Sequence, residues 1–340
     1  MARPAVGMTL FATGFNAWRQ LDFDCETQPD SREPDDKFSF TNVLEGGVIE
    51  RPVSRLQYTL VQRDNVLCKA GFGLANQVDQ EAAYAYAETA NGEILAIEPE
   101  VTCPTSDDHG PPPPTTNVLV QYASAAKLKR GERRKTWRCV HPAKAIAAFD
   151  AGFVILYQDG TVATMGDARF EDCLGRDCTE RSPPEDPGIV HDLANLGDPV
   201  VRIAAGGHSL AALTESGGTY LWGMMSPSGA HRQQAFPSLT GIPNYVEFDD
   251  GKDIVDFALG DSHAIALTMD GCVLVIGDNT NGQLGFDGQA RRRIDSWTTA
   301  TVRVPHGHEV VAVAAGPKSS FVLTSSVHAR GDRTRRDAAE

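Results

Sequence analysis

The stretch IVDFALGDSHAIALTMDGCVLVIGDNTNGQLGF, residues 254–286, is the part of the chain that indicates its fold. Its apolar runs end at a glycine or at an Asp-Gly pair, and Asp270-Gly271 is the dipeptide that favours tight hairpin turns. The closing run 281–285, Asn-Gly-Gln-Leu-Gly, has the composition of a corner, because glycine can take the positive φ that corners need. The pattern predicts three short strands, over residues 254–259, 263–268 and 272–276.

The same pattern recurs upstream, in VRIAAGGHSLAALTESGGTYLWG (201–223) and in AIAAFDAGFVILYQDGTVATMG (145–166). Each copy ends at a closing glycine, and these glycines, Gly166, Gly223 and Gly277, are 57 and then 54 residues apart. A period of about 50 residues built from short strands is typical of propeller arrays, whose units must stack because none buries both faces alone. The sequence therefore predicts an all-β fold, a single closed β-propeller.

The repeated frame also resembles a known family. Its elements are Ala-x-Gly-x-x-His, Ala-Leu-Thr, Asp-Gly, Trp-Gly or an equivalent, and Asn-Gly-Gln-Leu-Gly, and they resemble the regulator of chromosome condensation repeat family, a β-propeller family of the β-lactamase-inhibitor protein II superfamily. Residues 260–285 match closely and residues 204–223 match well. The resemblance implies seven four-stranded blades, whereas counting turns gives six, so both numbers remain open. Trp222 occupies the tryptophan position of the frame, and the other copies, which mark a divergent member, have Thr13, Ala70, Met165 and Ile276 there.

The two ends of the chain complement each other. Residues 8–23 read as the end of a repeat that lacks its beginning, and residues 310–326 read as a beginning that lacks its end. We expect the N- and C-terminal strands to share one blade, which removes an open sheet edge. Two unrelated edge strands are the alternative. The predicted domain covers residues 1–327, and the charged tail 328–340 is expected to be disordered.

Three loop insertions are expected in this domain, at 24–37, 101–116 and 125–142. The first is acidic and contains proline, and the second contains four consecutive prolines, which cannot join a central strand. The third is a basic segment in a chain of net charge −14, and it is interpreted either as a nuclear-import or phosphate-binding patch or as a solvated loop. Its basic residues are Lys127, Lys129, Arg130, Arg133, Arg134, Lys135 and Arg138.

Composition limits the remaining possibilities. A net charge of −14 argues against a chain that coats nucleic acid over its whole surface. The seven cysteines show no Cys-x-x-Cys pair and no zinc spacing, which favours free thiols in a reducing compartment. The apolar N-terminus is interrupted by polar residues and glycine, so the repeat is favoured over a signal peptide, and no run is long enough to span a membrane. We expect an intracellular protein of the cytoplasm or nucleus that uses no metal and no cofactor.

Few residues suggest catalysis. Gly207-His208-Ser209 imitates a hydrolase nucleophile elbow, but a strand follows it where that motif needs a helix. His208 and His263 each follow a repeat glycine, and we expect such a ring to donate its N–H to the backbone of a neighbouring blade. When the copies are aligned on their Leu-Thr pairs, the two histidines are one position out of register. We expect no catalytic residues and no enzymatic activity.

The sequence is best interpreted as a non-enzymatic scaffold that binds other proteins through its rim loops, since loops on a rigid body carry recognition. Asp261, His263 and His208 are the candidate partner-binding residues. The family resemblance implies an alternative, because some members are guanine-nucleotide exchange factors for a small GTPase and use acidic loop residues of the type of Asp261. A chromatin-associated partner is suggested by the family name alone. We expect a monomer with no small-molecule substrate and no membrane contact.

Overall fold

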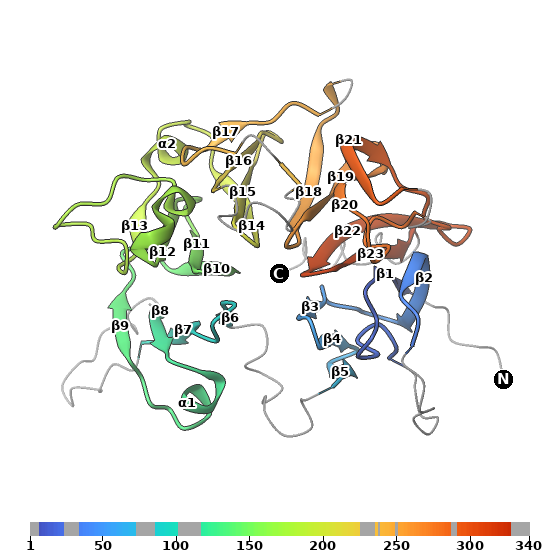
Figure 1. Cartoon of the computed structure of the whole chain (residues 1–340), viewed down its shortest axis with the longest axis horizontal. Helices are drawn as coiled ribbons and strands as arrows, with labels where there is room; N and C mark the ends of the chain where they lie inside the picture. The colour runs from blue at the N-terminus through green and yellow to red at the C-terminus, as the bar shows by residue number, and fades with distance from the viewer. Residues whose placement is uncertain are drawn as a thin grey trace, which may run out of the picture.

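A computed structural model describes residues 7–23, 34–72, 86–100, 117–224, 235–236, 239–248, 251–286 and 291–327. These residues form six antiparallel sheets arranged around a common centre, the blades of a β-propeller (Figure 1). The prediction of an all-β propeller is confirmed, whereas six sheets and not seven lie in the described ranges. The tail 328–340 and the segments 24–33 and 101–116 of the expected insertions lie outside them.

The blades are named here by their strands. The terminal blade contains β22 (His308–Gly316), β23 (Ser319–Ser326), β1 (Met8–Gly14) and β2 (Lys37–Gly46). Blade I contains β3 (Val53–Ser54), β4 (Tyr58–Arg63) and β5 (Val66–Gly71). Blade II contains β6 (Tyr86–Glu88), β7 (Ile94–Pro99), β8 (Asn117–Tyr122) and β9 (Lys135–Arg138), with helix α1 (Ala125–Lys129) before β9.

Blade III contains β10 (Ala143–Phe149), β11 (Gly152–Tyr157), β12 (Val162–Gly166) and β13 (Gly188–Ile189), with the short helices η1 (Ala168–Leu174) and α2 (His191–Ala194). Blade IV contains β14 (Val200–Gly206), β15 (Ser209–Thr214), β16 (Thr219–Gly223) and β17 (Asn244–Tyr245). Blade V contains β18 (Ile254–Leu259), β19 (His263–Thr268), β20 (Val273–Asp278) and β21 (Arg293–Thr299). The first two strands of blade V have the predicted bounds, and the third is slightly longer than predicted. None of the helices in the described part of the chain is long and apolar enough to cross a membrane.

The closing glycines recur because the third strand of a blade presses against the corner before its second strand. Gly277 has φ of +110°, and a Cβ there would lie 2.4 Å from the carbonyl oxygen of Ser262. Gly223, at φ of +141°, would place a Cβ 2.1 Å from the carbonyl oxygen of His208. Only glycine avoids both the strained φ and the clash, so the residue type repeats with the blade.

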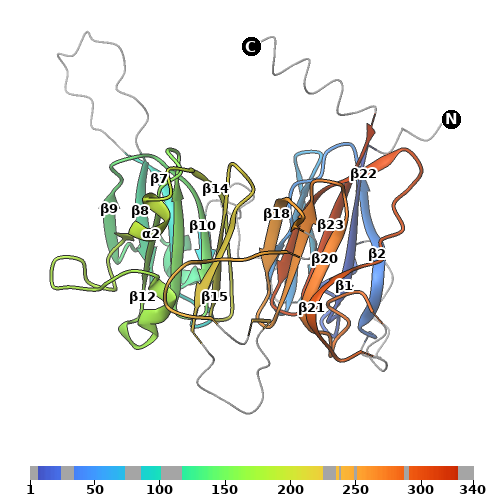
Figure 2. The same cartoon turned by 90° about the horizontal axis from the view of Figure 1, so that it is seen from above.

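The termini share one blade, as predicted. Strand β1 lies between β2 and β23, in an antiparallel register that pairs Met8 with Ser325 and Gly14 with Ser319. All seven residues of β1 are buried. Figure 2 shows β1 beside β23 and β2 beside β1. The chain thus completes this blade with strands from both of its ends, and each end covers the edge of the other.

The Asn-Gly-Gln-Leu-Gly corner is a structural motif that occurs twice. Asn279 is fully buried, and its Oδ1 accepts the backbone N–H of Leu284 at 3.0 Å. Asn16 accepts the N–H of Leu21 in the same way, also at 3.0 Å. Residues 16–21 after β1 thus form the same corner, as expected of the end of a repeat, and buried amide side chains satisfy the turn's own backbone.

The expectation of a loop insertion over 125–142 is corrected. Strand β9 pairs with β8 from Gln121↔Lys135 to Val118↔Arg138 and forms the outer edge of blade II. Trp137 of β9 packs against the apolar cluster that blade II shares with blade III. Its sequence looks like a loop because it is dense in charge, but an outer strand exposes most of its side chains and tolerates charge there.

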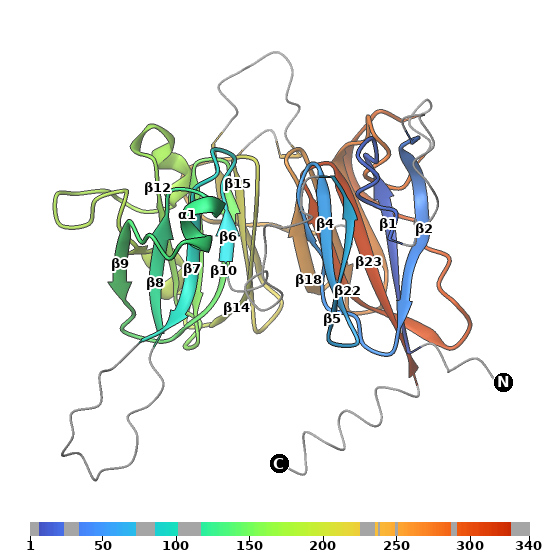
Figure 3. The same cartoon turned by 90° about the horizontal axis from the view of Figure 1, so that it is seen from below.

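The apolar core lies between blades. Shared clusters of buried side chains join blades II and III, III and IV, IV and V, V and the terminal blade, and the terminal blade and blade I. Two further apolar clusters each contain residues of a single blade, one in blade I and one in blade II. In the described residues, blades I and II therefore share no apolar cluster. Figure 3 views this junction, with β4 and β5 on one side and β6 and β7 on the other.

Candidate functional site

The candidate site is the inner rim, defined as the turns that join the first strand of each blade to the second. Neighbouring turns are linked by backbone hydrogen bonds. The N–H of Asp150 donates to the carbonyl oxygen of Gly207 at 2.8 Å, and the N–H of Asp261 donates to that of Pro317 at 3.0 Å. Ala90 donates to Asp150 at 3.3 Å. The next blade thus fixes the backbone of these three turns, two of which carry Asp150 and Asp261.

A cavity of about 740 Å³ opens inside the inner rim. Asp150 and Asp261 line it, together with the glycine-rich ends of the first strands and residues of blades I and II. Asp261 is half-buried and lies on the wall of this cavity, at the strand-to-strand corner where the sequence predicted a rim position. The geometry suits recognition, since its polar groups converge on a concave surface.

His208 joins the rim to the blade that precedes it. Its Nδ1 lies 3.4 Å from Oδ2 of Asp150, and the two side chains are 10% and 21% exposed. Its ring meets Phe170 edge-on, with centroids 5.1 Å apart. The structure therefore brings His208 and Asp150 together at the rim, where the histidine positions an acidic side chain.

His263 is a core residue. The side chain is fully buried, and its Nε2 donates to the carbonyl oxygen of Ser319 in the terminal blade at 3.2 Å. This confirms the predicted bond to a neighbouring blade's backbone, but a fully buried ring cannot touch a partner directly. Burial lowers the pKa of His263 to about 4, so the imidazole is neutral at physiological pH.

The neighbouring Gly260 makes room for this ring. A Cβ at Gly260 would lie 2.1 Å from Cε1 of His263, so the glycine is needed for close approach. The glycine that the sequence marks as a strand break is therefore the residue that lets the histidine reach the next blade.

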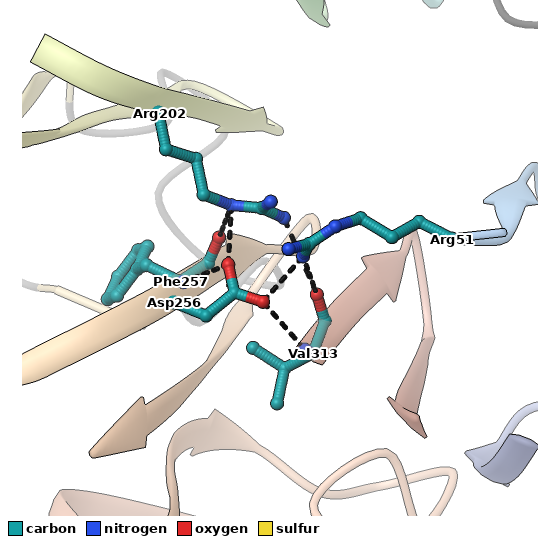
Figure 4. A network of polar contacts seen from close by, with 5 residues as sticks. All are labelled: Arg51, Arg202, Asp256, Phe257 and Val313. Carbon is teal, nitrogen blue, oxygen red and sulfur yellow. Dashed lines mark hydrogen bonds and ion pairs between the residues drawn. The ribbon is translucent and has the colours of Figure 1, made fainter. Parts of the chain in front are cut away.

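A network of charged side chains, here called the brace, was not foreseen from the sequence and joins several blades (Figure 4). Asp256 of β18 is almost fully buried, and its Oδ1 lies 2.6 Å from Nε of Arg202 in β14. Its Oδ2 lies 2.5 Å from Nη1 of Arg51, which precedes blade I, and accepts the N–H of Val313 in β22 at 2.8 Å. One carboxylate thus connects blade V to two other blades and to the segment leading into blade I.

The brace holds more positive than negative charge. Burial lowers the pKa of Arg202 to about 10, the carboxylate of Asp256 raises it, and the guanidinium of Arg51 lowers it. Arg202 is still protonated at neutral pH. Aligning the repeats would have revealed this pair, because Arg202 and Asp256 stand four residues before Gly206 and Gly260 and carry opposite charges at one repeat position.

The basic segment borders the outer part of blade II, and six of its seven cations are paired with carboxylates. Arg133 lies 2.6 Å from Glu98, Arg134 contacts Glu93, and Lys135 contacts Asp186 of blade III. Three further ion pairs are Lys127–Glu132, Arg130–Glu132 and Arg138–Glu100. The sequence shows seven cations against one acid in this segment, but the fold brings acids from β7 and blade III beside them.

In the described residues, no group of three His, Cys, Asp or Glu side chains could hold a metal ion. The five cysteines of these ranges, Cys68, Cys139, Cys173, Cys178 and Cys272, are free thiols.

Comparisons with known proteins agree with this architecture. The Regulator of chromosome condensation (RCC1) repeat family matches residues 254–283. The mouse regulator of chromosome condensation is 34% identical over 133 residues, which are 39% of this chain and 30% of that protein. Human E3 ubiquitin-protein ligase HERC2 is 32% identical over 186 residues, 54% of this chain and 3% of that protein. The chain thus spans less than a third of the length of these curated relatives.

Solved structures match over nearly the whole chain. Prp20p from Saccharomyces cerevisiae has a TM-score of 0.59 at 12% identity, covering 100% of this chain and 97% of that one. Human WBSCR16 has a TM-score of 0.55 at 15% identity, covering 94% and 99%. At such identities these matches establish the β-propeller fold, and the family model identifies a repeat of this type in residues 254–283.

Proposed function

We propose that this propeller of regulator of chromosome condensation repeats is a non-enzymatic scaffold that binds other proteins through its inner rim, within the cytoplasm or nucleus. The observation that carries the proposal is the rim itself. Inter-blade hydrogen bonds fix the turns bearing Asp150 and Asp261 around a cavity of about 740 Å³. Carboxylates held on a rigid body suit the recognition of a partner's basic side chains, and the net charge of −14 attracts such partners from a distance.

The relatives support a binding role, because they are proteins with different activities. The same repeat occurs in a regulator of chromosome condensation and in an E3 ubiquitin-protein ligase. A module that is combined with such different proteins is best explained by recognition, with the reaction supplied elsewhere.

Affinity purification with quantitative mass spectrometry tests the proposal. The tagged full chain is compared with a rim variant, Asp150→Asn with Asp261→Asn, and with Asp192→Asn on helix α2 as the matched control. We expect at least one protein to be enriched with the wild type and the control and to be lost with the rim variant. Equal recovery of every enriched protein with the rim variant would contradict binding at the inner rim.

A second candidate is nucleotide exchange on a small GTPase. It is favoured by Asp261 on the rim, by the family resemblance, and by Prp20p, the matching fold whose binding to Gsp1p and histones was studied. An exchange factor loosens the contacts of a GTPase with nucleotide phosphates and magnesium, and acidic rim residues can do this.

Release of a fluorescent guanine nucleotide from a panel of small GTPases separates the two candidates. We expect no acceleration by the wild type or by Asp261→Asn. Strong acceleration that the substitution abolishes would replace the scaffold by an exchange factor.

A further inference from the structure

The junction between blades I and II differs from the other described junctions because charged and aromatic side chains carry it. Nη1 of Arg55 donates to the carbonyl oxygen of Glu88 at 3.3 Å, and its Nε lies 3.9 Å from Oε2 of the same residue. The cavity of the inner rim extends into this junction, where Leu56, Tyr58 and Tyr86 line it. We name this part of the cavity the I–II cleft.

The walls of the I–II cleft are aromatic and partly open to solvent. Phe72, which also lines it, is 66% exposed, and Leu56 is 44% exposed. Trp18 extends the apolar surface outward, with its ring centroid 5.9 Å from that of Phe72. Burial raises the pKa of Tyr86 to about 12, so its hydroxyl stays neutral. Exposed aromatic side chains around a concave site are typical of surfaces that bind a partner.

One polar group in the cleft lacks its hydrogen bond. Nε of Arg55 is buried and has no acceptor, and its distance from Glu88 is too long for a hydrogen bond. A buried donor on a charged group is costly to leave without an acceptor. The Arg55 side chain is 27% exposed, so a shift of this side chain towards a carbonyl oxygen in the cleft would give Nε its acceptor.

The wall of the same cavity outside the cleft carries carboxylates. Asp261 lines the cavity on blade V, and Asp150 lines it on blade III, where its carbonyl oxygen accepts the N–H of Ala90 in blade II. A ligand that fills the whole cavity therefore meets an apolar wall and an N–H donor in the cleft and acidic groups outside it. The volume of about 740 Å³ is enough for two or three amino-acid residues and lies in the range of ordinary binding sites.

We propose that the I–II cleft binds an extended peptide segment of a partner protein, in which an apolar residue is followed by lysine or arginine. The apolar side chain lies between Leu56, Phe72 and Tyr86. The peptide carbonyl accepts the hydrogen bond of Arg55 Nε, and the basic side chain reaches Asp261. Consecutive residues of one peptide supply all three groups, which a small apolar ligand does not. The inference rests on the proposed scaffold function and names the chemistry of its partner.

Fluorescence anisotropy with synthetic peptides tests the inference on the full chain. The probe is a fluorescein-labelled 12-residue peptide that alternates leucine-lysine pairs with glycine. One matched peptide has glutamate in place of lysine, and another has serine in place of leucine. We expect the leucine-lysine peptide to bind at least about tenfold more tightly than either matched peptide. Equal binding of the glutamate peptide would overturn the inference.

Two variants locate the binding. Leu56→Glu places a charge in the apolar wall of the cleft, and Met269→Glu places one at another exposed apolar side chain, on the turn after β19. We expect Leu56→Glu to weaken the leucine-lysine peptide by about tenfold or more and Met269→Glu to change its affinity less than twofold, while both variants melt near the wild type. An unchanged affinity in Leu56→Glu would overturn the inference.

The same variant separates this inference from the proposed function. If a cellular partner is lost with the rim variant but retained with Leu56→Glu, the scaffold stands and the I–II cleft is refuted as its site. The alternative outcome is that the rim variant loses no cellular partner, although the leucine-lysine peptide is preferred and Leu56→Glu weakens its binding. In that case the I–II cleft is supported as a peptide site and the proposed function of the rim is refuted.

Discussion

Two histidines at nearly the same place in their repeats serve opposite neighbours. His208 lies in the turn before β15 and faces Asp150 of the preceding blade, whereas His263 is the first residue of β19 and bonds to Ser319 of the following blade. A shift of one position reverses the direction of a side chain in a strand. The one-position offset in the sequence is thus sufficient to give the two rings different roles.

Burial of His263 predicts acid sensitivity. Its pKa in the folded protein, about 4, lies below the ordinary 6.5, so the unfolded chain binds a proton between these values that the folded chain does not. The stability contributed by the neutral ring is present above pH 6.5 and is lost as pH falls towards 4, by up to about 3 kcal/mol. Urea unfolding from pH 7.5 to 4 measures this loss.

The matched variant is His263→Gln, which keeps a donor for Ser319 but does not titrate. The difference in unfolding free energy between wild type and variant should narrow by about 3 kcal/mol over this range. Parallel pH profiles of the two proteins would show that His263 is not the responsible group.

At the scale of elements, the structure shows that the basic segment is part of blade II and that most of its cations form ion pairs. Arg133 and Arg134 face Glu98 and Glu93 from β7 and the turn before it, and Lys135 faces Asp186 of blade III. These pairs fasten an outer strand to its own blade and to the next one. Trp137 contributes to the second contact, since its Nε1 donates to Asp186 at 3.2 Å.

Removing the charges at the start of β9 and just before it should therefore have a modest cost in stability. Replacing Arg133, Arg134 and Lys135 by serine should lower the unfolding free energy by about 1 to 2 kcal/mol, because exposed ion pairs each contribute roughly 0.2–1 kcal/mol. Replacing Lys127, Lys129 and Arg130 should cost less, since Lys127 and Arg130 pair with Glu132 in the same segment and not with another strand. Thermal and urea unfolding distinguish the two triple variants.

The interpretation of the basic segment as a nuclear-import signal is tested separately. Paired cations attract phosphate less than free ones, so we expect nuclear enrichment of a fluorescent fusion to be the same in wild type and in both triple variants. A clear loss of nuclear enrichment in either variant would support a nuclear-import signal in the basic segment.

At the scale of the whole molecule, the brace joins segments that are far apart in the chain. Asp256 connects Arg202, Arg51 and the backbone of Val313. Asp256→Ala removes the shared carboxylate and leaves a guanidinium, on a side chain only 25% exposed, without its partner. We expect the unfolding free energy to fall by about 3 kcal/mol, as in other broken buried pairs.

A second substitution tests the cause. Arg202→Met combined with Asp256→Leu should recover a large part of the loss, because it removes the unpaired charge together with its carboxylate. Additive losses in the double variant would mean that the two side chains act independently.

Deleting residues 1–23 should remove most of the stability, because β1 is buried between β2 and β23 and no other described strand can take its place. Thermal melting measures the loss, and a chain that starts at Gly7 is the control, since it keeps β1. Adding a peptide of residues 7–23 should partly restore the melting midpoint. An unchanged midpoint in the truncated chain would contradict the shared blade.

The sequence by itself determined the repeat, the strands of blade V, the corners and the shared terminal blade. These features depend on local rules: closing glycines such as Gly277 must avoid a carbonyl within their own blade, and apolar runs between turns specify strands. Such constraints recur with every copy, so their period can be read without a structure.

Only the tertiary structure decided which charges meet and which side chains are buried. Asp256 joins residues on three other segments, the acids beside Arg133 and Lys135 come from other strands, and His263 is enclosed by a blade formed near the chain's end. The tertiary structure also decided that the described residues form six sheets and that Nε of Arg55 has no acceptor. The physical reason is that electrostatic pairing and burial depend on distances in space between blades, and a residue's neighbours along the chain do not specify these distances.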